Sequence, residues 1–471
     1  MTKSNSKDMT QGSPMKLIIS FFLPLMLGML FQQFYSMMDT IIVGKFLGVN
    51  ALAAVGSTGS VNFMVIGFCM GVCSGFAIPV AQRFGAKDYH YLRKFVANSV
   101  WLSALCAAVM TVVVCALCRN ILQWMRTPSD IIQGAYDYIF VIFLGIPVIY
   151  LYNLLSGILR SLGDSKSPLM FLILSSLLNI GLDLAFILVF DMGVAGAAWA
   201  TVISQGISGV LCLFYIKKKY DVLKLSKEEW RIDKSCMAKL CNMGIPMGLQ
   251  YSITAIGSVI LQTSVNTLGS TAVASMTAAG KVSMFFCCPF DAMGSTMSTY
   301  AGQNLGAGEL KRITKGLLSC CMIGFVYSVL AFVTLFFFSP KIALLFLDAK
   351  EMAILDNVRL MLLITSAFYM TLALVNILRF TIQGLGYSRL AVLAGVCEMA
   401  ARALVGAFLV PVAGYTGVCF ASPVAWIFAD LFLIPAYVCI MKRLARDAKI
   451  VRPDAVVDKK HESGNMEAAH G

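Results

Sequence analysis

Long apolar stretches alternate with short polar ones along the whole chain. Each apolar stretch has about 20 residues or more, which is the length a helix needs to cross a bilayer. The expected spans are Leu17–Val43, Ala51–Val80, Phe95–Leu117, Ile131–Leu155, Leu169–Phe190, Val194–Ile216, Leu240–Val265, Ala272–Tyr300, Ile313–Phe338, Met352–Ile377, Leu390–Val410 and Val418–Met441. The pattern predicts an all-α integral membrane protein with about twelve transmembrane helices.

The composition supports this fold class and argues against an enzyme. Of the 471 residues, 59% are hydrophobic and 13% are charged, whereas soluble proteins have roughly 25% charged residues. The polar start of the chain lacks a cleavage signature, so we expect the first span to be retained. The 15 cysteines lack the spacing of a metal site, and no phosphate loop or nucleophile motif is present. We therefore expect no cofactor, and energy from an ion gradient or a partner subunit.

The basic residues lie mostly on one side of the expected spans. Of the 37 Lys and Arg residues, 28 fall in alternate connections that include both termini, and six fall in the others. Because basic residues favour cytoplasmic loops, both termini are predicted to lie in the cytoplasm of a multi-pass protein of the cell membrane. This topology also accounts for the net charge of +13 without a nucleic-acid partner.

The two halves of the chain resemble each other at a nearly constant offset of 221–223 residues. Four pairs carry the repeat: Pro24 and Pro246, AQRFGAKD (81–88) and GQNLGAGE (302–309), LRSLGDS (159–165) and IQGLGYS (382–388), GVAGAA (193–198) and GYTGVC (414–419). Six spans per half give both halves the same orientation. The repeat therefore predicts two six-helix lobes related by a pseudo-twofold axis along the membrane normal, with a cavity between them.

This repeat divides the chain into five parts. Residues 1–16 are a cytoplasmic N-terminus, 17–216 the first lobe, 217–239 a cytoplasmic linker and 240–441 the second lobe. Residues 442–471 are expected to form a polar, disordered tail, because they contain few large apolar side chains.

Asp39 is an acidic residue within the first apolar span. A carboxylate at membrane depth is costly, so it usually faces a protein interior or a water-filled cavity. Along its helix Asp39 lies ~33 Å from Leu17, and Asp183 lies ~21 Å from Leu169. Thr201 enters from the opposite side and lies ~10 Å deep. All three residues thus fall in the outer half of the first lobe.

Two carboxamides share helix faces with these acids. Asn179 precedes Asp183 by four residues, and Gln32 precedes Asp39 by seven. We predict that Asp39, Asn179, Asp183 and Thr201 bind Na⁺ or a shared proton. The alternative is that these groups only hold helices together through hydrogen bonds.

The second half has its own intramembrane charges. Glu398 and Arg402 are four residues apart, so a local salt bridge and a substrate contact are equally compatible with the spacing. The side chains of Phe34, Tyr35, Met37 and Met38 are candidates to line a plastic cavity for apolar cations.

The chain resembles the multidrug and toxic compound extrusion (MATE) transporters, from Lys16 to about Met441. The resemblance is carried by MMDTIIVGKFLGVNALAAVG (37–56), the paired AQRFGAKD and GQNLGAGE loops, LRSLGDSKSP (159–168), and NIGLDLAFIL (179–188) followed by GVAGAAWAT (193–201). It is similar to prokaryotic members, including the DNA-damage-inducible branch.

The resemblance implies a V-shaped pair of lobes and efflux of amphiphilic, often cationic compounds in exchange for H⁺ or Na⁺. It places the family's first-lobe cation site on the same four residues, with Gln32 and Asn153 as weaker candidates. It also implies that the first helix bends at Pro24 on protonation. Where some members have an acid in the seventh helix, this chain has Gln250, which we include among the possible cavity residues.

The sequence thus predicts a monomeric efflux antiporter for small lipophilic cations. The alternative is a flippase for lipid-linked saccharides, since related families share the two-lobe architecture. A flippase needs a basic groove for a pyrophosphate, and only Lys281, Arg379 and Arg402 lie within or at the ends of the spans.

Overall fold

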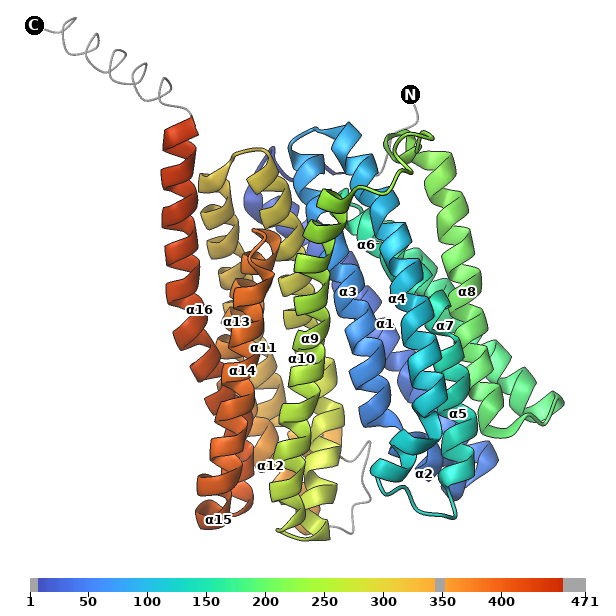
Figure 1. The fold of residues 1–471 in the computed structure, drawn as a ribbon. Helices are drawn as coiled ribbons and strands as arrows, with labels where there is room; N and C mark the ends of the chain where they lie inside the picture. Colours follow the sequence, from blue (N-terminus) through green and yellow to red (C-terminus); the bar gives the residue numbers. More distant parts are fainter. Residues whose placement is uncertain (1–6, 344–351, 452–471) are drawn as a thin grey trace, which may run out of the picture.

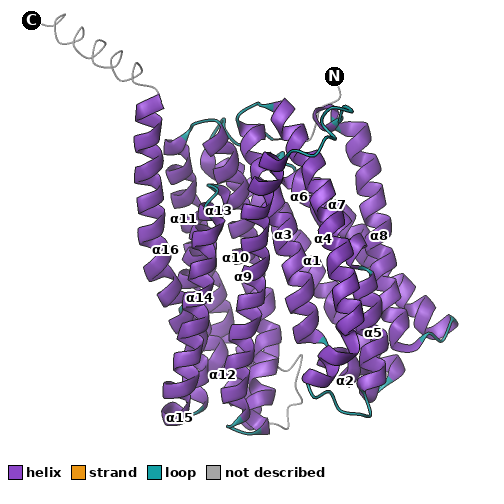
Figure 2. Cartoon of the chain, in the orientation of Figure 1, coloured by secondary structure: helices purple, strands orange, loops and turns teal. Residues whose placement is uncertain are grey.

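The computed structural model describes residues 7–343 and 352–451, whose regular structure is helical throughout. Figures 1 and 2 show long helices that run side by side and are joined by short loops. The N-lobe consists of α1 (Pro14–Leu47), α2 (Val49–Ser57), α3 (Gly59–Gly85), α4 (Tyr89–Trp124), α5 (Ile132–Leu144), α6 (Ile146–Ser161), α7 (Lys166–Leu184), η1 (Ala185–Val189) and α8 (Gly193–Lys219).

After the linker, which contains η2 (Asp221–Leu223), the C-lobe follows the same order. It consists of α9 (Lys234–Asn266), α10 (Ser270–Gly306), α11 (Leu310–Ala343), α12 (Met352–Ala367), α13 (Tyr369–Gly384), α14 (Ser388–Leu404), η3 (Val405–Leu409), α15 (Val410–Ala413) and α16 (Tyr415–Val451). We call the end of the molecule that carries the linker the linker end.

The helices that are long and apolar enough to span a membrane correspond to the spans expected from the sequence. Within the described residues there are 10 of them, or up to 12 if each of two bent pairs counts as one span. The span expected at Ile131–Leu155 is α5 and α6, which meet at 47°, and that at Met352–Ile377 is α12 and α13, which meet at 52°. Gly145, with Pro147 directly inside α6, explains the first break.

The internal repeat extends to local irregularities of the helices. Besides the two bent pairs, each lobe has a short π-helical segment, η1 after α7 and η3 after α14. Such segments are rare and mark functional sites frequently. Their recurrence at matching places supports the predicted two-lobe, all-α membrane fold.

Helix α1 does not pack within a single lobe. Its first half contributes Ile18 and Leu25 to the hydrophobic core of the C-lobe. Its second half contributes Val43 to the core of the N-lobe. The change of lobe falls after Met29, which still packs against the C-lobe core, and the helix is continuous through Pro24. The lobe boundary predicted at residue 17 therefore does not coincide with the boundary between the two hydrophobic cores.

Helix α9 crosses in the opposite direction. Leu240, near its start, belongs to the core of the N-lobe, whereas Val265, near its end, packs in the C-lobe. Pro246 lies inside α9 as Pro24 lies inside α1. Next to it, a Cβ atom on Gly75 of α3 would lie 2.5 Å from the Cα atom of Gly244. The two helices thus touch backbone to backbone, which only small residues permit.

Two glutamines join the lobes at the linker end. Gln82 of α3 donates a hydrogen bond from Nε2 to the carbonyl of Gly384 in α13, at 2.9 Å. Gln303 of α10 donates from Nε2 to the carbonyl of Ser161 in α6, at 2.8 Å. Both donors and both acceptors come from the repeated loop motifs, so the two bonds are counterparts across the pseudo-twofold axis. We call this pair the glutamine latch.

The linker is fixed to α4. Glu229 accepts a 2.6 Å hydrogen bond from Nε of Arg93 and one from the backbone N–H of Ser226. Burial alone would raise the pKa of Glu229, but these hydrogen bonds outweigh burial and lower it. Trp230 packs edge-on against Trp101. The polar segment between the lobes is therefore an ordered brace.

The C-terminal helix is longer than expected. Residues 442–451 were predicted to belong to a disordered tail, and for these residues the prediction is wrong, because α16 continues to Val451. The rest of the predicted tail, 452–471, and the first six residues lie outside the described part of the chain.

Removing both latch glutamines is expected to loosen the linker end. Each hydrogen bond contributes about 0.5–1.5 kcal/mol, so the two together contribute about 1–3 kcal/mol. Gln82→Ala with Gln303→Ala should therefore speed deuterium exchange near Gly85 and Gly306 by roughly 5- to 150-fold. Gln133→Ala is the matched control, because Gln133 bonds only to Asp137 on the surface of α5. Unchanged exchange in the double variant would contradict the latch.

Replacing Glu229 should weaken the brace. Glu229→Gln is expected to cost about 1.5–3 kcal/mol, measured by thermal unfolding at neutral pH. Because the pKa of Glu229 is lowered in the folded state, its contribution is present above the unfolded value of about 4.3. That contribution disappears as the pH falls through the folded value. Glu228→Gln, an exposed neighbour, should behave as wild type, and equal losses in both variants would contradict the role of Glu229.

Candidate functional site

Two buried carboxyl groups meet between α1 and α7. Asp39 is 9% exposed and Asp183 is fully buried. The two groups lie close enough to share a hydrogen bond when one of them is protonated. Within the described residues, Oδ1 of Asp39 and both carboxylate oxygens of Asp183 have no hydrogen-bond donor. Two ionised carboxylates in this arrangement would repel each other strongly, so a proton or a cation must compensate them.

Asn179 and Thr201 extend this group of oxygens. Asn179 Nδ2 donates a 3.3 Å hydrogen bond to Oγ1 of Thr201 in α8, so the oxygen of Asn179 remains available. That oxygen is buried and has no donor among the described residues. Asn179 lies one helical turn before Asp183, on the same face of α7. The structure thus gathers the four residues that the sequence predicts for the cation site.

A layer of longer side chains surrounds the two acids. Tyr35 lies near Gln32 and Gln205, and Tyr138 of α5 lies near both carboxyl groups. The sequence predicted Gln32 but missed Gln205 and Tyr138. Gln205 follows Thr201 by four residues, so its helical spacing was a usable signal. Tyr138 carried no such signal, because nothing in its surrounding sequence indicates that α5 packs here.

Two other residues named from the sequence, Asn153 and Pro24, do not take part in the contacts described above. The amide of Asn153 donates at 2.8 Å to the carbonyl of Ile149 in its own helix. Pro24 lies ~22 Å along α1 from Asp39, so any coupling between the two must travel through the helix. The bend at Pro24 stays a prediction. Of the proposed cavity residues, Phe34 is 48% exposed and Met37 and Met38 are half-buried.

Comparison with known proteins identifies the family. The family model named MatE matches residues 24–185 and 246–408, which is most of both lobes. The chain belongs to the MatE family. It is 29% identical over 338 residues to the probable multidrug resistance protein YoeA of Bacillus subtilis, covering 70% of this chain and 73% of that protein. The probable multidrug resistance protein YpnP of Bacillus subtilis is 31% identical over 310 residues, covering 65% and 68%.

The fold comparison agrees with the family. A crystal structure of a MATE protein in complex with MaL6 superposes with a TM-score of 0.88 at 22% identity, covering 95% of this chain and 100% of that one. At this identity the likeness concerns the fold alone. MatE proteins are transporters, so this chain is a multi-pass membrane transporter and not an enzyme. The resemblance drawn from its repeated motifs is confirmed.

The C-lobe of this MatE protein also contains buried charges next to its π-helical segment. Glu398 of α14 bonds to Arg379 of α13 and lies 3.6 Å from Nη2 of Arg402. All three residues are buried, with exposed fractions of 5% for Glu398, 6% for Arg379 and 9% for Arg402. The expected pair of Glu398 and Arg402 is therefore present, and Arg379 joins it from another helix. This arrangement favours the salt-bridge interpretation over a substrate contact.

Two further acids lie near Arg379. Asp430 of α16 is 6% exposed and lies close to Arg379 and Glu398. Asp291 of α10 is exposed and lies near Arg379 and Tyr251. A carboxylate midway along a membrane-spanning helix usually faces the protein interior or a water-filled cavity rather than lipid. Gln250, another predicted cavity residue, is buried and accepts a 2.6 Å hydrogen bond from Gln383.

Removing Arg379 should destabilise the C-lobe. Arg379→Met leaves Glu398 with one partner and Asp430 with none nearby, and breaking a buried ion pair costs about 3–5 kcal/mol. Arg119→Met, an exposed arginine at the end of α4, is the matched control. Thermal unfolding of the purified proteins measures the difference. Equal midpoints for the two variants would show that the buried charges do not stabilise the lobe.

Proposed function

We propose that this MatE protein is a secondary active antiporter that exports amphiphilic, often cationic small molecules in exchange for H⁺ or Na⁺. The observation that carries the proposal is the pair of neighbouring, buried carboxyl groups of Asp39 and Asp183, for which the described part of the chain supplies no salt-bridge partner. A site of this kind must take up a mobile cation to stay neutral, and losing that cation changes its charge. No phosphate-binding loop offers another source of energy.

The coupling ion is proposed to bind at Asp39, Asp183, Asn179 and Thr201. Unpaired carboxylate and carboxamide oxygens are the ligands that suit a hard cation such as Na⁺. The same carboxyl pair can instead hold one shared proton. Whether the site binds Na⁺ or a shared proton, we expect the two acids to act together rather than as independent sites.

The C-lobe is proposed not to exchange ions. There Glu398 already has two tethered cations, the guanidinium groups of Arg379 and Arg402. Arginine stays protonated at every physiological pH, so this charge cannot be released during a cycle. The charges around Glu398 thus stay fixed, and we place the proposed ion exchange at the paired acids of the N-lobe.

The substrate class rests on two further observations. The relatives YoeA and YpnP are described as probable multidrug resistance proteins. In this chain Asp291 is exposed in a membrane-spanning helix and lies near Tyr251, and a carboxylate with an aromatic neighbour suits an organic cation. The flippase alternative needs free basic groups, and two of its three candidate cations, Arg379 and Arg402, are committed to Glu398.

During transport the cavity between the lobes would open alternately at the linker end and at the opposite end. The glutamine latch joins the lobes at the linker end and must open to expose the cavity on that side. The basic linker and C-terminal helix support a cytoplasmic location for the linker end and for both termini. We propose that the protein works in this orientation in the cell membrane.

Dye efflux from vesicles tests the mechanism. Proteoliposomes with ethidium inside receive a pH gradient or a Na⁺ gradient, one at a time. Asp39→Asn and Asp183→Asn should each reduce gradient-driven efflux at least roughly tenfold, because a loss of about 1.4 kcal/mol in ion binding already has that effect. Asp130→Asn is the control, since Asp130 is an exposed acid between α4 and α5.

The outcomes separate the alternatives. Efflux driven by only one gradient identifies the coupling ion. Normal efflux in both aspartate variants would reject the proposed coupling site. No efflux by the wild type, together with transbilayer movement of a lipid diphosphate, would favour the flippase.

A further inference from the structure

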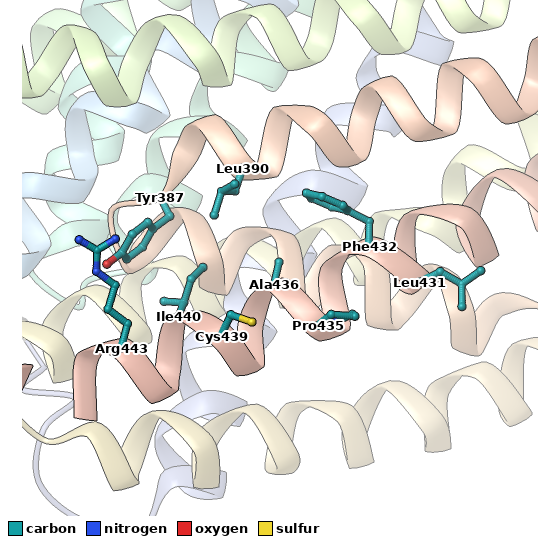
Figure 3. Close-up of a pocket in the computed structure, with 9 residues that line it drawn as sticks. All are labelled: Tyr387, Leu390, Leu431, Phe432, Pro435, Ala436, Cys439, Ile440 and Arg443. Atoms are coloured by element: carbon teal, nitrogen blue, oxygen red, sulfur yellow. The ribbon is translucent and has the colours of Figure 1, made fainter. Parts of the chain in front are cut away.

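We propose that a groove on the lipid-facing side of the C-lobe binds a phospholipid with an anionic headgroup. The groove lies between the start of α14 and the second half of α16 and has a volume of about 420 Å³ (Figure 3). Its lining residues are Tyr387, Leu390, Leu431, Phe432, Pro435, Ala436, Cys439, Ile440 and Arg443. This inference does not depend on the proposed transport activity.

The shape of the groove follows from the sequence of α16. Leu431, Pro435, Cys439 and Arg443 recur every four residues, so they form one face of the helix. Pro435 cannot donate the backbone hydrogen bond of its position, and Ala436 beside it is small. Leu431, Pro435 and Cys439 are exposed. The helix therefore presents a hollow apolar strip instead of a packed ridge.

The length of this strip matches one leaflet of a bilayer. From Leu431 to Arg443 the helix rises ~18 Å, and half of the hydrocarbon core measures ~15 Å. The apolar part of the groove can thus hold an acyl chain along its length. Arg443 then lies at the level of the headgroups.

The polar end of the groove carries positive charge. Figure 3 shows the guanidinium of Arg443 next to the hydroxyl of Tyr387 at this end, with Leu431 at the other. Within the described residues, Arg443 has no ion-pair partner. Lys442 and Arg446 beside it are also exposed. A guanidinium binds phosphate oxygens in a bidentate manner, and basic pockets between membrane helices bind anionic lipid headgroups.

Lipid retention by the purified full-length protein tests the proposal. The protein is titrated with phosphatidylglycerol or with phosphatidylcholine of the same acyl chains, and bound lipid is counted by native mass spectrometry. The wild type should retain phosphatidylglycerol in preference. Arg443→Gln should bind it roughly fivefold more weakly, since one basic residue contributes about 1 kcal/mol near an anionic lipid. Lys218→Gln, an exposed charge at the end of α8, should have no effect.

A second pair of variants tests the apolar part. Cys439→Trp fills the groove and should reduce binding of both lipids. Val438→Trp places the same side chain on the neighbouring exposed position outside the groove and should leave retention unchanged. Equal retention of the two lipids by the wild type would overturn the proposal, and so would unchanged binding in Arg443→Gln.

Discussion

The architecture depends on the exchange of helix halves between the two lobes. The first half of α1 is buried in the C-lobe and the first half of α9 in the N-lobe, so neither lobe has a complete core without the other's leading helix. A proline lies near each crossing, Pro24 in α1 and Pro246 in α9, where the missing backbone hydrogen bond makes the helix easier to deform. Relative movement of the lobes must therefore be accommodated within these two helices. Asp39 lies on the second half of α1, so an ion bound there acts on the same helix that links the lobes.

The two lobes have the same arrangement of helices but differ in their buried charges. Both have a bent pair of helices and a π-helical segment at corresponding places. Among the described residues, the N-lobe acids Asp39 and Asp183 form no salt bridge. In the C-lobe Arg379 and Arg402 pair with Glu398, and Asp430 lies near Arg379. Desolvating charge is costly in either case. In the C-lobe tethered guanidinium groups offset this cost, and in the N-lobe we propose that a mobile cation does so. With this difference, the charge of the N-lobe site could change with the ion gradient, while the charges around Glu398 would stay the same.

The lengths of the apolar stretches predicted the helices, because a segment that spans lipid must supply its own backbone hydrogen bonds. Depth along those helices was enough to bring Asp39, Asp183, Asn179 and Thr201 together. The crossing of α1 and α9 was not predictable in this way, since an apolar helix face does not specify which lobe covers it. For the same reason the sequence paired Glu398 with its neighbour in sequence, Arg402, but missed Arg379 on another helix.

The repeated loop motifs have a clear physical role in the structure. In the first half of the chain they supply Gln82 as a donor and the Ser161 carbonyl as an acceptor, and in the second half Gln303 and the Gly384 carbonyl. Each motif thus bonds to the opposite lobe, so a change in one half disturbs a contact with the other. Because the two bonds are related by the pseudo-twofold axis, they oppose separation at the linker end from both sides. The latch is thus symmetric between the lobes, whereas the buried charges are not, and this asymmetry is the reason why we propose the ion site in the N-lobe.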